Sequence, residues 1–407
     1  MGFEQGLSGL NAASKSLDVI GNNVANSSTV GFKESQAQFA DVYANSMAGS
    51  SGGQAGIGVR VATVAQQFTQ GNITTTNNSL DMAISGSGFF RMDNNGSITY
   101  SRNGQFQLDK NGYIVDNQGN NLTGFLPNAA GTIVATTPAD IQISTADLLP
   151  KQTATVSAGL NLDARLTIPT VTPFDPNNAS TFNNSTSSTI YDSLGGAHTA
   201  SFYFVKTGTN AWNAYMTVDG TSVPSPAAAL TGMTFSSSGV LTTPAAAVTS
   251  ASFTPSGGGA AQTLSINFAG TSQFGSTFGV NSLSQDGYTS GHMTGFSTGS
   301  DGIVTGRYSN GQTKTLAQVV LANFSNAQGL QPLGNNQFAE TSKSGNPLVG
   351  TPGSASLGVL QTSATEDSNV DLTAELVNMI TAQRAYQANA QTIKTQDQIM
   401  QTIVNLR

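Results

Sequence analysis

The sequence contains no cysteine, and this absence excludes disulfide bonds, thiolate metal sites and thiol nucleophiles together. Charged residues are also scarce, at 9% of the 407 residues, and neither Lys nor Arg occurs between positions 207 and 306. The formal net charge of -7, without any basic cluster, argues against nucleic acid or an anionic membrane as a partner. We therefore expect the protein to bind its partners through packing and hydrogen bonds.

Long apolar runs are missing as well. No stretch approaches the roughly 18 consecutive apolar residues that a membrane-spanning helix needs, so we expect no membrane insertion. The first residues lack both the basic region and the continuous apolar segment of a secretory signal, and Gly6 stands where N-myristoylation requires Ser or Thr. If the protein leaves the cell, the sequence predicts a route that retains this N-terminus.

The sequence also lacks the motifs of known catalytic and cofactor sites. His198 and His292 lie in different parts of the chain, and we expect each of them on the surface or in a turn. Two GxSxG matches, around Ser51 and Ser297, do not follow an apolar strand as a nucleophile elbow would. We therefore expect no enzyme activity, no cofactor and no metal site.

Residues 3–24 follow the pattern of an amphipathic helix. Apolar residues recur at alternating steps of four and three, although three glycines in this stretch, and Gly2 just before it, weaken an isolated helix. Because such a helix is marginal by itself, we expect it to need a partner surface, for which the other end of the chain is the candidate. Its predicted apolar stripe consists of Phe3, Leu7, Leu10, Leu17, Ile20 and Val24.

A second helix is predicted for residues 371–407, which contain neither Gly nor Pro. Ser368, followed three residues later by Asp371, resembles a capping box that opens this helix. The four-three spacing continues over several heptads and favours a coiled coil, with an ordinary helix packed on its own domain as the alternative. The predicted seam consists of Leu372, Leu376, Met379, Ile380, Tyr386, Ala390, Ile393, Met400, Ile403 and Val404.

Between these helices the pattern is typical of β-strands. Asn95-Gly96, Asn103-Gly104 and Asn111-Gly112 recur at a regular spacing, and each is followed by residues that favour strands. Because Asn-Gly adopts the positive φ angles of tight hairpins, the three pairs predict an antiparallel meander.

The simplest fold class is α+β and multidomain. The N- and C-terminal helices would form an α-helical coiled-coil core domain, and two nested β-rich domains would lie between them in the chain. The predicted segments are 1–30 (N-terminal helix), 31–75 (connector, flexible at its Gly- and Ser-rich centre), 76–148 (first β domain, first part), 149–285 (inserted second β domain), 286–362 (first β domain, second part) and 363–407 (C-terminal helix). The detailed fold of residues 220–285 is left open.

Several motifs resemble those of the rod and hook family of bacterial flagellar axial proteins. The stretch GLNAASKSLDVIGNNVANSSTVGFKES is similar to the N-terminal signature of that family, and LDMAISGSGFF at 80–90, YSRNGQFQLD at 100–109 and the C-terminal helix are similar to further motifs. The segment from residue 172 to about 215 resembles the inserted domain of the hook branch. The resemblance covers nearly the whole chain and weakens between about 220 and 285. Its motif at the end of the first helix comprises Asn22, Asn23, Asn26, Gly31, Phe32 and Lys33.

The resemblance implies a self-assembling structural subunit of the curved tube that joins the rotary motor to the filament and transmits torque as a universal joint. The implied partners are copies of the chain itself, rod and hook-filament junction proteins, the hook cap and the flagellar type III export apparatus. The implied location is the extracellular flagellum, reached without a cleaved signal peptide. Two alternatives are a distal rod protein of the same family and a carbohydrate-binding or adhesin-like β protein. In the second, Trp212, Tyr203 and Tyr215 would form a sugar platform, although we expect these aromatic residues to pack on a sheet face or an interface.

Overall fold

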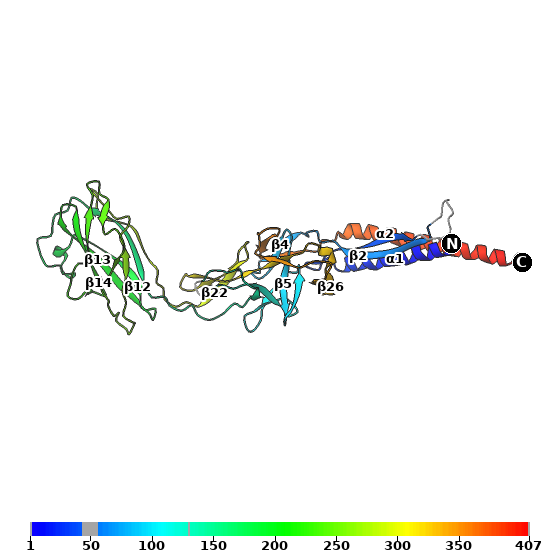
Figure 1. The fold of residues 1–407 in the computed structure, drawn as a ribbon, viewed down its shortest axis with the longest axis horizontal. Coiled ribbons are helices and arrows are strands. Elements are labelled where there is room, and N and C mark those ends of the chain that lie inside the picture. Colours follow the sequence, from blue (N-terminus) through cyan, green and yellow to red (C-terminus); the bar gives the residue numbers. More distant parts are fainter. Residues whose placement is uncertain (1, 43–55, 129–130, 406–407) are drawn as a thin grey trace. The chain divides into compact units, whose positions relative to one another are not determined.

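The computed structural model describes residues 2–42, 56–128 and 131–405 (Figure 1). The chain divides into two compact units: unit 1 comprises residues 1–144, 295–306 and 313–407, and unit 2 comprises residues 145–294 and 307–312. Helices lie near both ends of the chain, and strands dominate the sequence between them. The predicted α+β multidomain class is therefore confirmed. Among the described residues, no helix is long and apolar enough to cross a membrane.

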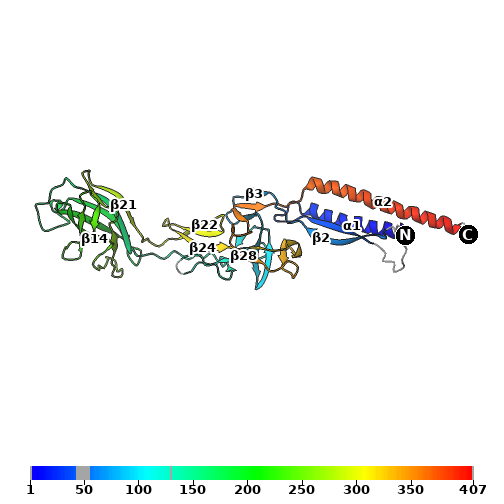
Figure 2. The same ribbon diagram turned by 45° about the horizontal axis from the view of Figure 1, so that its top comes forward.

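The helices α1 (Gly2–Ala25) and α2 (Leu372–Asn405) pack side by side in unit 1 (Figure 2). They run antiparallel, because Gly6 lies against Ile393 near one end and Asn23 contacts Glu375 near the other. A Cβ atom added to Gly6 would lie 3.0 Å from Cγ1 of Ile393. The absence of a side chain at this position therefore lets the two helices approach closely.

The helix α2 begins one turn later than the predicted capping box requires. Oδ1 of Asp371 accepts hydrogen bonds from the backbone N–H groups of Thr373 (2.9 Å) and Ala374 (3.2 Å), which makes Asp371 the N-cap. Oγ of Ser368 instead accepts from the N–H of Val370 at 3.3 Å. The prediction of Ser368 as the cap was wrong because the Asp371 carboxylate, which the sequence reasoning placed inside the box, satisfies the first free N–H groups itself.

The predicted connector forms a strand ribbon where the structure describes it. β1 (Ser35–Val42) and β2 (Gly58–Gln66) pair antiparallel and lie along α1 (Figure 2). Near the start of the helix, Nε2 of Gln5 donates to the carbonyl of Gly56 at 2.6 Å, and the N–H of Val59 donates to Oγ of Ser8 at 3.3 Å, which attaches this end of the ribbon to the helix. Residues 43–55, which include most of the Gly- and Ser-rich centre, lie outside the described residues.

Most other strands of unit 1 belong to a 13-stranded sheet. Its strands are β5 (Phe89–Asn94), β6 (Ser97–Ser101), β7 (Gln107–Leu108), β8 (Ile114–Val115), β9 (Asn121–Phe125), β10 (Ala139–Asp140), β22 (Met293–Thr298), β23 (Ile303–Tyr308), β24 (Thr313–Val319), β25 (Leu321–Asn323), β26 (Gln331–Gly334), β27 (Gln337–Ala339) and β28 (Leu348–Gly350). Two separate antiparallel pairs bring distant segments together: β3 (Ile73–Thr75) with β30 (Ala364–Glu366), and β4 (Met82–Ser85) with β29 (Val359–Thr362). A buried aromatic cluster packs edge to face beside the sheet and includes Phe89, Tyr100, Phe324 and Phe338.

Of the turns predicted at the three Asn-Gly pairs, the structure contains two and lacks the one at Asn103-Gly104. Asn95 and Gly96 have φ angles of 51° and 92° and connect β5 directly to β6, so this predicted hairpin is confirmed. Gly112 (φ 85°) lies in the turn that joins the paired strands β7 and β8. The predicted turn at Asn103-Gly104 was wrong, because β6 pairs with β5 and β27, and not with β7. The backbone of Gly104 instead packs against Met82, whose N–H donates to the Gly104 carbonyl at 2.9 Å.

Unit 2 contains two sheets whose buried side chains form one core. One sheet has β11 (Thr155–Asp163), β18 (Val248–Thr249), β19 (Ser265–Asn267), β20 (Ser272–Phe274) and β21 (Gly279–Gln285). The other has β12 (Asn184–Tyr191), β13 (Ala197–Gly208), β14 (Ala211–Val218), β15 (Thr221–Val223), β16 (Thr231–Phe235) and β17 (Leu241–Thr243). Residues of both sheets, including Leu160, Ile266, Phe202 and Phe204, are fully buried in the shared core. The stretch 220–285, whose fold the sequence left open, completes both sheets with short strands.

The structure contradicts the alternative of a sugar platform in unit 2. Trp212 is only 1% exposed within the core, and its indole N–H donates to Oε1 of Gln273 at 3.0 Å. Tyr215 lies three residues along the same strand and therefore on the opposite face of the sheet. There it stacks on Phe174 with ring centroids 4.2 Å apart, and Tyr203 pairs with it across the strands. The three aromatic residues cannot form one surface.

The expectation of a surface or turn histidine fails for His198, which is buried in unit 2 between two carboxylates. Its Nδ1 lies 2.6 Å from Oδ2 of Asp219, and its Nε2 lies 3.4 Å from Oδ2 of Asp192. Burial alone would lower the pKa of His198, but the hydrogen bonds and charges of Asp219 and Asp192 raise it overall. His292 is exposed and contacts only Asp147 among the charged groups of the described residues.

Candidate assembly surface on the terminal helices

The contact between α1 and α2 is built from small and polar residues. On α1 the buried positions include Gly6, Ala13 and Ile20, which recur every seven residues and therefore lie on one side of the helix. On α2 the positions that face α1 include Ala382 and Asn389, and a Cβ added to Gly9 would lie 2.7 Å from Oδ1 of Asn389. Close backbone approach, and not large apolar area, thus defines this seam.

The predicted stripe of α1 only partly coincides with that buried side. Ile20 is buried, whereas Leu10, Leu17 and Val24 are half-buried. Phe3 and Leu7 are exposed. Gly6 and Ala13 belong to the buried side but not to the predicted stripe, because such small residues add almost nothing to a hydrophobic pattern. Their spacing by seven residues, continued by Ile20, places them on one side of the helix.

The predicted seam of α2 is divided between two sides of the helix. Met379, Ala390 and Ile393 are half-buried toward α1 or at its margin. Tyr386 is 38% exposed, and the side chain of Ile403 lies outside the described residues. In the first turns of α2, four large apolar side chains are exposed on a different side from the seam, and we name them the outer apolar face. They are Leu372, Leu376, Val377 and Ile380.

The last turns of α2 lie beyond the end of α1. Because Gly6 is opposite Ile393 and the helices are antiparallel, α1 has no residues left to cover positions beyond about 397 (Figure 1). Ile399, Met400 and Val404 are accordingly exposed, Val404 to 70%. We name these three residues the overhang. Met400 and Val404 continue the spacing of the seam. The side of α2 that packs against α1 is therefore uncovered beyond the N-terminal end of α1.

Asn23 of the predicted motif joins three elements. Its Nδ2 donates to the carbonyl of Ser35 at 2.8 Å and its Oδ1 accepts from the N–H of the same residue at 3.0 Å, which attaches β1 to the end of α1. The same Nδ2 lies 3.3 Å from Oε2 of Glu375 on α2. Asn23 is 1% exposed, so these contacts satisfy a buried amide and set the register of the helices.

Lys33 and Gly31 connect the N-terminal motif to the chain before α2. Nζ of Lys33 lies 2.6 Å from Oε1 of Glu366, and Nη1 of Arg102 lies 3.0 Å from Oε2 of the same carboxylate. Burial lowers the pKa of Lys33, although the carboxylate of Glu366 opposes this effect. Gly31 has a φ of +72°, and its N–H donates to the carbonyl of Glu366 at 2.7 Å. This buried network holds the start of the ribbon against the last strand before α2.

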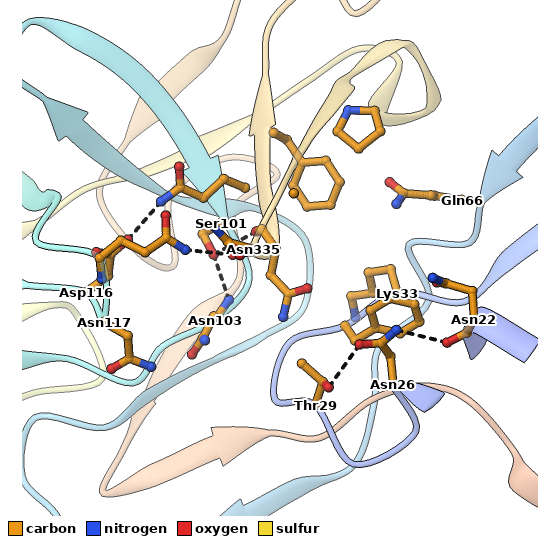
Figure 3. Close-up of a pocket in the computed structure, with 17 residues that line it drawn as sticks. Asn22, Asn26, Thr29, Lys33, Gln66, Ser101, Asn103, Asp116, Asn117 and Asn335 are labelled. Atoms are coloured by element: carbon orange, nitrogen blue, oxygen red, sulfur yellow. Dashed lines mark hydrogen bonds between the residues drawn. The ribbon is translucent and has the colours of Figure 1, made fainter. Parts of the chain in front are cut away.

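The remaining motif residues border a polar cleft of about 490 Å³ (Figure 3). Figure 3 shows Asn26 turned toward Asn22 and Thr29, with its Nδ2 donating to the Asn22 carbonyl at 2.9 Å and its Oδ1 accepting from the Thr29 hydroxyl at 3.2 Å. Phe32 also lines this cleft. These bonds stop the helix and shape the following turn. Among the described residues, no cluster of His, Asp and Glu side chains is arranged to hold a metal ion.

Four family models match the chain. They are the flagella basal body rod protein (residues 3–33), the flagellar hook protein FlgE/F/G D1 domain (83–191), the flagellar basal body protein FlaE D2 domain (161–288) and the flagellar basal body rod FlgEFG protein C-terminal region (361–406). The matched regions include the motif at the end of α1, most of the core of unit 2 and all of α2.

Full-length relatives are similar to the chain from end to end. The flagellar hook protein FlgE of Escherichia coli (strain K12) is 46% identical, with 100% of both chains covered. The FlgE of Borreliella burgdorferi is 31% identical over 99% of this chain and 98% of the relative. The crystal structure of Helicobacter pylori flagellar hook protein FlgE2 has a TM-score of 0.53 at 15% identity, covering 71% of this chain and 99% of that chain, which shows a shared fold. The chain therefore belongs to the family of flagellar hook proteins, which are structural subunits and not enzymes.

Proposed function

We propose that copies of this chain assemble into the hook by covering the outer apolar face and the overhang of α2 with helices of neighbouring copies. The observation that carries the proposal is the exposure of seven large apolar side chains on α2: four on the outer apolar face, away from the contact with α1, and three on the overhang, beyond the end of α1. Burying one Leu or Ile side chain stabilises a contact by about 1.5–3 kcal/mol. Several such side chains in each copy supply a driving force that an isolated chain cannot use.

We further infer a coiled-coil core domain made of residues 1–30 and 363–407. The four-three spacing of α2 and its two apolar sides support more than one helical neighbour in the polymer. Phe3 and Leu7 add exposed apolar area at the matching end of α1. The connector 31–75 would link this core to the β domains.

The nested arrangement of the β domains is part of the same proposal. The first β domain would comprise residues 76–148 and 286–362, interrupted by the second at 149–285. In its support, unit 1 combines segments that precede and follow residues 145–294, the main segment of unit 2. An inserted domain can thus vary in sequence and length while the terminal helices keep their contacts.

Family membership supports the further partners. These would be rod and hook-filament junction proteins at the two ends of the polymer, a hook cap during growth, and the flagellar type III export apparatus. The proposed location is the extracellular flagellum, where the polymer transmits torque while it bends. The absence of cysteine is compatible with passage of an unfolded chain through a narrow channel, since no disulfide can form on the way.

The proposal is tested by placing a charge on the outer apolar face. We expect Ile380→Asp to abolish polymer formation, because a carboxylate would have to lose its water in the contact between copies. Electron microscopy and sedimentation of the purified protein measure the polymer, and circular dichroism verifies the fold. Gln391→Asp, at an exposed polar position of the same helix, serves as the control and should still polymerise. Normal tubes formed by Ile380→Asp would refute the proposed contact.

A further inference from the structure

A second cleft, of about 320 Å³, lies between α1, β1 and α2. Asn23 lines it from α1, Glu34 and Ser35 from the ribbon side, and Glu375 and Thr381 from α2. All three elements belong to unit 1, and hydrogen bonds of Asn23 join them. The cleft is therefore a built feature of the helix pair and its ribbon.

The carboxylate of Glu375 lies in this cleft without a cation. The residue is only 5% exposed, and its oxygens accept long hydrogen bonds from the side-chain amides of Asn23 (3.3 Å) and Asn378 (3.4 Å). No Lys, Arg or His of the described chain forms an ion pair with it. Burial, and then the charge of Glu375, raise the pKa of Glu34 in the same cleft. Two carboxylates thus face one small space that no Lys, Arg or His of the described ranges lines.

An arginine without an acidic partner lies on the outer side of α2. Arg384 is exposed, and no ion pair joins it to any acid among the described residues. It follows Ile380 by four residues and Val377 by seven, so it borders the outer apolar face. It cannot reach Glu375 of its own chain, which lies nine residues and therefore about 13 Å away along the helix. Among the described residues, Lys394 forms no ion pair either, but its helical neighbours are Asp397, three residues further on, and the polar residues Gln387, Gln391, Gln398 and Gln401.

We propose that Arg384 of one copy enters the cleft of a second copy and pairs with Glu375 there. This inference rests on the proposed self-assembly and adds to it the polar contact that orients one helix pair against the next. A guanidinium suits the cleft because it keeps its charge when desolvated and can donate two parallel hydrogen bonds to a carboxylate. The apolar contacts would supply most of the affinity, whereas this pair would set the register between copies.

A double-mutant cycle measures the pair directly. Arg384→Gln and Glu375→Gln each remove one charge, and each should raise the critical concentration for polymerisation by more than about tenfold, because one charge is left buried and unpaired. The double variant should be no worse than either single variant, since the two residues act on one contact. Lys394→Gln removes the same charge from the same helix and is the matched control, with an unchanged critical concentration expected. Circular dichroism and the fluorescence of the single tryptophan verify that each monomer is folded.

The outcomes separate the pair from assembly itself. Failure of the unmodified protein to polymerise would refute the proposed function. If the unmodified protein polymerises, independent additive effects of the two substitutions, or an effect of Arg384→Gln below twofold, would overturn the pair. An effect of Lys394→Gln as large as that of Arg384→Gln would do so as well. If instead added sodium or magnesium ions rescued Arg384→Gln completely, a simple cation would suffice in the cleft and the arginine assignment would be wrong.

Discussion

Unit 2 buries its large apolar side chains, whereas the pair of terminal helices leaves many of them exposed. Unit 2 closes two sheets on a core in which Trp212, Phe202 and Phe204 are at most 1% exposed. The helix pair buries glycine, alanine and amide groups between its members and leaves large apolar residues such as Ile380 and Val404 outside. The first region is complete as a fold, and the second is shaped to be completed by other copies. Unit 2 should therefore be stable in a single copy, whereas the terminal helices should gain stability when the copies polymerise.

We expect the largest effect from a substitution in the core of unit 2. Phe204 is fully buried and contacts Phe268 edge to face, with ring centroids 6.3 Å apart. Phe204→Ala should lower the free energy of unfolding of unit 2 by about 3–5 kcal/mol, because it leaves a cavity in a packed core. The fluorescence of Trp212, the single tryptophan, reports this transition during denaturant titration. Leu194→Ala, at an exposed position of the same unit, should change it by less than about 0.5 kcal/mol.

In Phe204→Ala, only the unfolding transition reported by Trp212 fluorescence should shift, because the substitution lies in unit 2. The variant should still present α1 and α2 to other copies, so some capacity for helix contacts should survive. If both units unfolded together in a single transition at the same denaturant concentration, unit 2 and the helix pair would not be independent in stability.

A slightly smaller effect is expected at the base of the helix pair. Glu366→Gln leaves the cations of Lys33 and Arg102 buried beside a neutral side chain, and it should lower the stability of unit 1 by about 3 kcal/mol. Far-ultraviolet circular dichroism should show an earlier transition, while Trp212 fluorescence in unit 2 stays unchanged. Glu4→Gln, which neutralises an exposed carboxylate of α1, is the control and should be nearly silent. An unaltered circular dichroism transition in Glu366→Gln would contradict the structural role of this buried network.

The smallest expected effect is a dependence of the stability of unit 2 on pH. The raised pKa of His198 means that its charged form stabilises the fold fully below the pKa of an unfolded histidine, about 6.5. This stabilisation is lost as the pH rises through the higher pKa of the folded state. The denaturant midpoint of Trp212 fluorescence should therefore be lower at about pH 9 than at about pH 6.

Two histidine variants test the origin of that pH dependence. His198→Gln should flatten the profile over this range, because Asp192 and Asp219 would no longer have a titrating partner between them. His292→Gln, at the exposed histidine of the same unit, should retain it. A profile that survives in His198→Gln would assign the effect to another group.

Part of the fold was readable from the sequence because the relevant signals are local. The spacing of apolar residues predicted both terminal helices, and Asn95-Gly96 predicted its hairpin through the positive φ angles that both residues adopt. The same dipeptide at Asn103-Gly104 misled, because a close approach to Met82 can require glycine as much as a turn does. The amide contacts of Asn23 could be assigned only through a motif, since their partners are distant in the chain.

The sequence by itself determined that this protein has two amphipathic helices at its ends, β-rich material between them and no chemistry that depends on thiols. Only the tertiary structure decided which side of α2 faces α1 and which side remains open. The physical reason is that an apolar pattern records how much surface must leave water, but not which partner covers it. Close approach at Gly6 and the contact of Asn23 with Glu375 select the side, and neither small residues nor buried amides contribute to that pattern.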